Sequence, residues 1–358
     1  MIGMMLIVFL VLLMLGVPVC FSLAIPTVFY FFLNTGTVPI EFIAHQTTNP
    51  LMNYVLIALP AFLLSGRMMN GTGVTHRIFD FANALVGRFR GGLIYTNIVA
   101  SMMFASMSGT AVGDAGGLGQ IEMDMMDRAG YKREISAGIT ASSSVLGPII
   151  PPSVNMVILG ATAGISIGLV TPTEAAVLAI DYAIFLGILY KEASLRNIWQ
   201  TLEETVAAAG TFMYITAVAG FFTWILTREG LPQFLTSVLT PLIGSSQVVG
   251  LLLIAGFLLI AGCFLDTTAA ILMITPILMP IVNSLGIDPI VFGVVMVVAL
   301  IIGIITPPFG ICLFVISDVA KLPVSAVTKE AIRYLPAMVA ALLLIIFFPQ
   351  TVTFLAGL

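Results

Sequence analysis

Two short stretches, GPIIPP at residues 147–152 and GIITPP at residues 303–308, decide the fold of this chain. Both have the form G-x-I-x-P-P, and each lies within an apolar stretch. Two consecutive prolines remove two backbone N–H donors and clash with the preceding helical turn, and the glycine before them permits backbone angles that other residues avoid. A helix that reaches either stretch must therefore unwind there, which leaves several carbonyl oxygens without a helical partner.

The surrounding sequence is apolar enough to lie in a lipid bilayer. Hydrophobic residues make up 59% of the 358 residues, charged residues make up 8%, and the mean hydropathy is +1.15, whereas a soluble domain has about 25% charged residues. A chain of this length supplies roughly ten spans of about 20 residues each. The net charge of −4 favours neither nucleic acid nor an anionic membrane surface as a partner. We expect an all-α polytopic membrane protein.

Each Pro-Pro stretch is preceded by a cluster of small and polar residues, SMSGTA at 106–111 and DTTAA at 266–270. Thr110 precedes Pro151 by 41 residues, and Thr268 precedes Pro307 by 39. One such motif would be explained by an ordinary proline kink, but two in the same order at nearly the same spacing indicate an internal repeat. Paired broken helices in two halves of a chain point to the binding site of a transporter.

The carbonyl oxygens freed at the breaks need partners, because each unsatisfied group in hydrocarbon costs several kcal/mol. A small hard cation such as Na⁺ is suitable, since it prefers oxygen ligands. The half-helix that begins after each break presents a positive dipole end, which favours an anion. The sequence therefore predicts cation sites together with an anion site.

Acidic residues in or beside the apolar runs are functional candidates. Asp114 and Asp266 follow or open the small-polar clusters, and each either takes part in ion binding or caps a helix through its side chain. Glu174 has the spacing of a residue in an acidic first turn, and Asp181 and Asp318 are expected near a membrane interface. The clusters of Lys and Arg between the runs, with Arg67 and Glu204 among their residues, are the best candidates for cytoplasmic faces by the positive-inside rule.

At these motifs the chain resembles the large membrane subunit of tripartite ATP-independent periplasmic (TRAP) transporters, the DctM type. The resemblance spans nearly the whole chain. Its motifs include PAFLLSG at 60–66, SGTA at 108–111, PIIPPS at 148–153, TPTEAA at 171–176 and TPPFG at 306–310.

This resemblance implies an inverted-repeat, elevator-type importer with two re-entrant hairpins and two unwound helices, located in a bacterial inner membrane. It implies Na⁺ as the coupling ion and no organic cofactor. The implied partners are a small four-helix membrane subunit, a periplasmic binding protein and a small organic acid such as a sialic acid or a C4-dicarboxylate. No enzymatic activity is expected, because the sequence shows no catalytic pair or metal-ligand spacing.

Carried over residue by residue, the resemblance places one Na⁺ between each hairpin tip and the unwound segment that faces it. The first ion would be held by Ser106, Ser108, Gly109, Gly147, Ile150 and Pro152. The second would be held by Asp266, Thr267, Thr268, Gly303, Thr306 and Pro308. The substrate would bind between the two, near Thr110, Asn155 and Thr268.

The same resemblance divides the chain into scaffold and transport parts. Residues 1–90 and 169–245 would be scaffold helices, 91–168 and 246–322 the two transport-domain repeats, and 323–358 a C-terminal helix. One departure stands out: the family carries several dozen further residues where this chain has only Leu169 and Val170 between Gly168 and Thr171. A divergent chain, an engineered deletion or an omitted stretch would each produce it. It bears on the scaffold more than on the ion sites.

Two other functions remain open from the residues alone. A stand-alone Na⁺/carboxylate symporter would use the same breaks without partner proteins. A channel also uses backbone carbonyls, although typically with one filter loop per subunit of a symmetric oligomer. Two related breaks in one chain favour a carrier.

Overall fold

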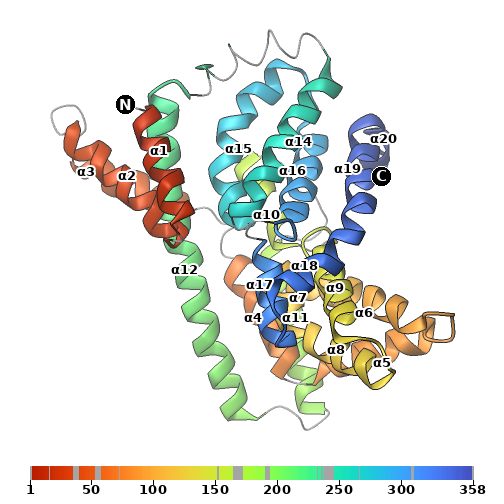
Figure 1. The fold of residues 1–358 in the computed structure, drawn as a ribbon. Helices are drawn as coiled ribbons and strands as arrows, with labels where there is room; N and C mark the ends of the chain where they lie inside the picture. The colour runs from red at the N-terminus through yellow and green to blue at the C-terminus, as the bar shows by residue number, and fades with distance from the viewer. Residues whose placement is uncertain are drawn as a thin grey trace.

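All regular secondary structure in the described part of the chain is helical in the computed structural model (Figure 1). The structure describes residues 2–15, 17–34, 40–52, 58–71, 73–150, 153–163, 172–189, 194–231, 233–234, 237, 246–265, 267–307 and 310–356. The α-helices of the first half are α1 (Ile2–Met14), α2 (Val19–Leu33), α3 (Ile40–Thr48), α4 (Ala58–Gly71), α5 (Val74–Val86), α6 (Gly92–Ser108), α7 (Ala111–Gly117), α8 (Gly119–Arg128), α9 (Arg133–Ser143) and α10 (Val154–Ala163). Those of the second half are α11 (Pro172–Leu189), α12 (Leu195–Arg228), α14 (Gln247–Phe264), α15 (Thr267–Ser284), α16 (Pro289–Gly303), α17 (Ile311–Ala320), α18 (Val324–Ala331), α19 (Leu335–Phe347) and α20 (Gln350–Ala356).

The helices stop at both Pro-Pro stretches, as the sequence predicts. After α9, a single 3₁₀ turn at Ser144–Leu146 leads into non-helical residues, and helix resumes only with α10. Likewise α16 ends at Gly303, and α17 begins at Ile311 after Gly310, whose φ of 43° is left-handed. The two broken helices are therefore α9–α10 and α16–α17.

These two broken helices run in opposite directions through the molecule. Figure 1 shows α10, α14, α15 and α16 grouped in the upper part, and α4 to α9 with α17 and α18 in the lower part. The chain thus passes from the lower to the upper group through α9–α10, and from the upper to the lower group through α16–α17. This is the arrangement expected of an inverted repeat.

Several helices suit a bilayer by length and composition. Among the described residues, four helical stretches are long and apolar enough to cross a membrane, at Ile198–Arg228, Gln247–Phe264, Thr267–Ser284 and Val324–Phe347. Large apolar side chains such as Phe32, Ile260 and Phe347 are exposed on the outer helices, where lipid would cover them. The prediction of a polytopic membrane protein is confirmed.

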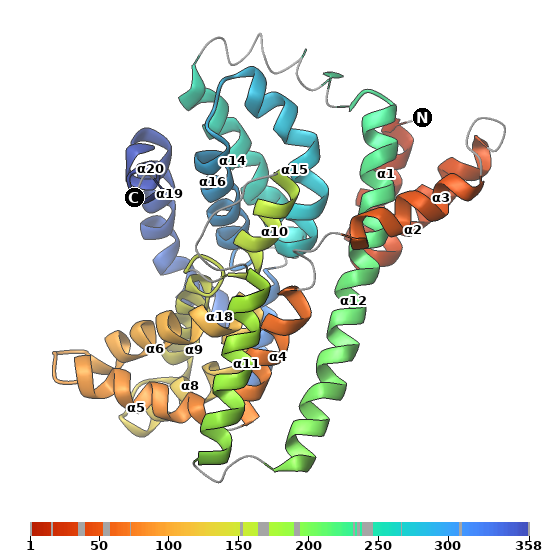
Figure 2. The ribbon, with the colours of Figure 1, turned by 180° about the vertical axis from the view of Figure 1, so that it is seen from behind.

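The main apolar core surrounds α16, which is buried from Val291 to Gly303 apart from one partly exposed residue. It packs against α10, α14, α15 and α19. The 34-residue helix α12 runs along the side of the molecule and contacts α2, α3, α4 and α15 (Figure 2). The lower group has smaller cores of its own, one of them centred on Phe79 and Phe104.

Candidate functional site

A cavity of about 570 Å³ lies where the lower and upper groups of helices meet. Its volume is in the range of small-molecule binding sites. Its wall comes from α4, the end of α6, α7, the residues flanking both breaks, the start of α15 and α12. The polar and charged side chains in this wall are Arg67, Thr110, Asn155, Glu204, Thr267 and Thr268.

The first small-polar cluster lies directly against the first break. α6 ends at Ser108, Gly109 turns the chain with a φ of 61°, and α7 begins at Ala111. A Cβ atom at Gly147 would lie 3.0 Å from the carbonyl oxygen of Thr110, so the two backbones approach closely here. The predicted tip and the predicted break are thus in contact.

Thr110 has a structural role at this tip as well. It is the N-cap of α7, and its Oγ1 accepts a hydrogen bond of 3.0 Å from the backbone N–H of Gly113. Its side chain still lines the cavity. Helix capping, one of the two roles predicted for Asp114, is therefore filled by Thr110, because both carboxylate oxygens of Asp114 are buried without a hydrogen-bond partner.

The second break lies against the end of α14, which directly precedes the second cluster. The backbone N–H of Gly310 donates to the carbonyl oxygen of Cys263, next to the end of α14, at 3.3 Å. Gly303 packs on Gly262, since a Cβ atom at Gly303 would lie 2.6 Å from the Cα atom of Gly262. The hydroxyl of Thr306 donates to the carbonyl oxygen of Ile302 at 2.7 Å, which leaves its oxygen lone pairs free to bind a cation.

A side-chain hydrogen bond connects the two repeats across the cavity. The hydroxyl of Thr268, at the start of α15, donates to Oδ1 of Asn155, near the start of α10, at 3.2 Å. Both residues line the cavity and both are buried, with 4% and 2% of their surfaces exposed. The three residues predicted to bind substrate are thus placed around one cavity.

The remaining predicted residues fall into two groups. Gly109, Gly147, Ile150, Gly303 and Thr306 lie at the tips and breaks but do not line the cavity. Asp266, Pro152 and Pro308 lie outside the described residues, as do the side chains of Ser106 and Ser108. The assignment of two sodium sites therefore stays a prediction.

Sequence reasoning missed the charged pair at the cavity. Nη1 of Arg67 on α4 lies 3.1 Å from Oε2 of Glu204 on α12, with 37% and 54% of the two side chains exposed. Arg67 is the one positively charged side chain among the lining residues that the structure describes. The two positions are 137 residues apart, and no motif marks either of them.

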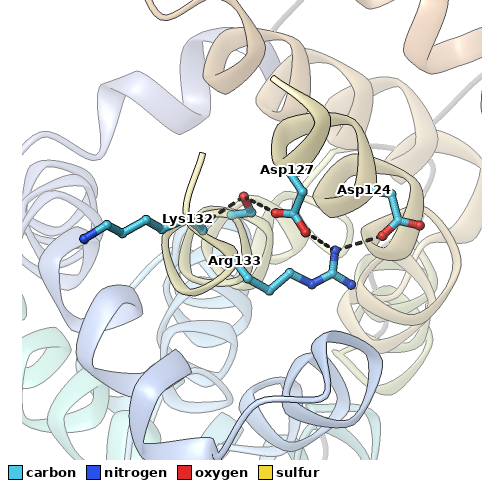
Figure 3. Close-up of polar contacts among 5 residues, drawn as sticks. Asp124, Asp127, Lys132 and Arg133 are labelled. Atoms are coloured by element: carbon cyan, nitrogen blue, oxygen red, sulfur yellow. Dashed lines mark hydrogen bonds and ion pairs between the residues drawn. The ribbon is translucent and has the colours of Figure 1, made fainter. Parts of the chain in front are cut away.

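The charged cluster between α8 and α9 lies apart from the cavity wall and pairs within itself. Figure 3 shows the guanidinium of Arg133 between the carboxylates of Asp124 and Asp127, at 2.8 and 2.6 Å. Partial burial lowers the pKa of Arg133, but hydrogen bonds to the two carboxylates and their charges outweigh it and raise the pKa above its ordinary value. The Arg133 guanidinium thus joins the end of α8 to the start of α9.

Broken apolar helices that meet around a cavity with a few polar side chains in its wall point to a membrane transport protein. Comparison with known families agrees: the model of the tripartite ATP-independent periplasmic transporter, DctM component, matches residues 6–170 and 162–351. The chain belongs to this family of transporters, and is not an enzyme.

Curated relatives cover nearly the whole chain. The sialic acid TRAP transporter large permease protein SiaM of Vibrio cholerae is 34% identical over 401 residues, which cover 94% of this chain and 93% of that protein. The sialic acid TRAP transporter permease protein SiaT of Haemophilus influenzae is 33% identical over 419 residues, covering 99% of this chain and 68% of that protein. The C4-dicarboxylate TRAP transporter large permease protein DctM of Pseudomonas aeruginosa is 32% identical over 363 residues, covering 83% and 85%.

These comparisons also support the shortened segment noted in the sequence. The match to SiaM extends over 401 positions, although it uses 94% of a 358-residue chain, so that relative has residues which this chain lacks. The two segments matched by the family model overlap at residues 162–170, a range that includes Leu169 and Val170. Residues 164–171 lie outside the described part of the chain.

Proposed function

We propose that this chain is the large membrane subunit of a Na⁺-coupled secondary importer for an organic acid. The observation that carries the proposal is the single cavity at which the two tips and the two breaks meet, with Arg67 in its wall. Relatives are named for sialic acids, C4-dicarboxylates and 2,3-diketo-L-gulonate, which carry carboxylate groups, and one is named for isethionate, a sulfonate. A guanidinium binds a carboxylate through two parallel hydrogen bonds, so Arg67 supplies the charge that such a substrate needs.

The sodium ions would be held at the contacts between tips and breaks. At the first, the Thr110 carbonyl lies against Gly147; at the second, the end of α14, which leads into the tip, meets the break where the Gly310 N–H bonds the Cys263 carbonyl. Carbonyl and hydroxyl oxygens are the ligands that hard cations prefer. Ion binding there would hold both halves of the cavity in the shape that receives the acid, because each ion would join a tip to a break.

The family relationship supports two partners. A small membrane subunit would complete the scaffold, and a periplasmic binding protein would deliver the acid to the chain in a bacterial inner membrane. The shortened segment at Leu169 and Val170 makes the small subunit the partner whose binding is most affected, since the segment belongs to the scaffold.

Uptake into proteoliposomes tests this function. The chain is reconstituted with the small subunit, and radiolabelled sialic acid or succinate is offered with the cognate binding protein. Uptake is expected only with an inward Na⁺ gradient and only when all three components are present. Uptake by the chain alone would instead establish a stand-alone symporter, and ion flux at channel rates without an acid would establish a channel.

A further inference from the structure

A second group of polar side chains is buried in the lower half of the molecule, apart from the cavity wall. Its members come from four helices that pack on one another, α6, α7, α8 and α9. They are Asn97, Ser101, Asp114, Glu122, Thr140 and Ser143. Asp114 and Glu122 are almost completely buried, with 2% and 1% of their surfaces exposed.

The hydrogen bonds of this cluster leave an excess of oxygen acceptors. The amide nitrogen of Asn97 donates to Oε2 of Glu122 at 2.9 Å and to Oγ1 of Thr140 at 2.8 Å, which uses both of its N–H groups. The hydroxyl of Ser101 lies 3.2 Å from Oε1 of Glu122. Both carboxylate oxygens of Asp114 and Oδ1 of Asn97 receive no hydrogen bond of normal geometry, because the Ser101 hydroxyl, which also lies beside Asp114, is bonded to Glu122 and Ser143. Buried acceptors without partners in a native fold call for a water, an ion or a proton at the site.

The two buried carboxylates of the cluster, Asp114 and Glu122, also lack a positively charged partner among the described residues. Asp114 lies near enough to Glu122 for the two carboxylates to repel each other. Two buried carboxylates that share a site cannot both stay ionised without a counter-charge, because an uncompensated charge in the interior is strongly destabilising.

The charged residues on the neighbouring helices do not supply that counter-charge. α6 and the 3₁₀ turn at Ser144–Leu146 carry no charged residue, and α7 carries only Asp114. Arg133 pairs with Asp124 and Asp127, and Lys321 pairs with Asp318 at the surface. Arg128 and Glu134 are exposed. Among the described residues, no lysine or arginine forms an ion pair with either buried carboxylate.

We propose that Asp114 and Glu122 form a binding site for one additional small cation, a proton or a sodium ion, separate from the two sodium sites at the tips. A proton on one carboxyl would convert an acceptor into a donor. A sodium ion would instead use the oxygens that now lack partners. The cluster adjoins the first tip, since α7 begins directly after Gly109 and Thr110. Occupancy of this site therefore adds a cation to the half of the transporter that carries the first break.

Infrared difference spectroscopy on the purified chain in lipid nanodiscs tests the proposal without substrate or partner proteins. Spectra are recorded on changing pH without Na⁺, and on adding Na⁺ at fixed pH. A protonated carboxyl gives its own C=O stretching band, whereas sodium binding shifts the carboxylate bands. We expect Asp114→Asn and Glu122→Gln each to abolish the signal of the cation that binds, either the pH-dependent C=O band or the Na⁺-dependent carboxylate shift. This corresponds to the loss of one bound cation per chain.

Asp318→Asn is the matched control, because that carboxylate is exposed and paired with Lys321. It should remove only the band of one exposed carboxyl, and should keep the bands of the buried carboxyls and the Na⁺-dependent shift of the unmodified chain. Loss of the pH-dependent band identifies a proton, and loss of the Na⁺-dependent shift identifies sodium. If both variants keep the signals of the unmodified chain, the proposal is wrong. Should neither variant fold, Ser101→Ala decides: it removes a hydrogen bond to Glu122 and must shift the band, and an unshifted band overturns the site. A failure of Na⁺-coupled uptake leaves these outcomes unaffected.

Discussion

Arg67 lies at the cavity wall and remains accessible although it forms an ion pair with Glu204. Its ion pair with Glu204 is 3.1 Å long, but more than a third of each side chain remains exposed. Exposed ion pairs contribute about 0–1 kcal/mol, so exchanging the Glu204 carboxylate for that of a substrate costs little. Gln200 also donates to Glu204, at 3.2 Å, and would retain it when Arg67 turns to the substrate.

Replacing Arg67 by glutamine should therefore weaken binding of the organic acid. Hydrogen bonds to a charged group contribute roughly 1.5–3 kcal/mol, so we expect uptake at low substrate concentration to fall about tenfold to a hundredfold. Glu204→Gln removes the ion pair and keeps Arg67, and should preserve uptake within a few fold. Equal losses in the two variants would mean that Arg67 acts only through its pair with Glu204.

The contact between α14 and α16 is set by two glycines. A methyl group at Gly262 would lie 2.4 Å from the carbonyl oxygen of Leu300, which is backbone and cannot move aside. Overpacking of this kind destabilises by about 1–3 kcal/mol, so Gly262→Ala should lower the midpoint of thermal unfolding in detergent micelles. Gly256→Ala is the control in the same helix, because a Cβ atom there meets nothing within 4 Å. Equal midpoints for the two variants would contradict this packing.

Elements governed by local chemistry could be predicted from the sequence. The ends of α9 and α16 follow from glycine and paired prolines, whose effect on the backbone does not depend on tertiary context. The repeat also predicted that tip and break would meet twice. Asp114 was harder, because a polar residue after a small-polar cluster suits a cap as well as an ion site, and only the structure gives the cap to Thr110.

Contacts between distant elements could not be predicted in this way. Thr268 and Asn155 are 113 residues apart and Arg67 and Glu204 are 137 apart, and no periodicity links either pair. Asn155 and Thr268 were predicted only through the family resemblance. Arg67 and Glu204 looked like members of charged loop clusters, because composition shows that a residue is polar but not which cavity it faces.

The cavity lies between parts of the chain that we predict to move relative to each other. α4 and α12 fall in the predicted scaffold, whereas α7, α10 and the start of α15 fall in the predicted transport repeats, and all of them contribute to the wall. An elevator mechanism requires these two parts to separate in each cycle, so a covalent bridge across the cavity should stop transport.

A bridge between Val112 on α7 and Ala208 on α12, both of which line the cavity, tests that motion. The two positions are changed to cysteine in a chain whose Cys20, Cys263 and Cys312 are replaced by alanine, and joined with reducible methanethiosulfonate cross-linkers of graded length. We expect cross-linking to block Na⁺-dependent uptake and reduction to restore it. The two single-cysteine variants, treated with the same reagents, measure any blockage of the cavity by the reagent itself. Undiminished uptake by fully cross-linked protein would show that the cavity wall does not separate during transport, and would leave local gating at the tips as the route for the substrate.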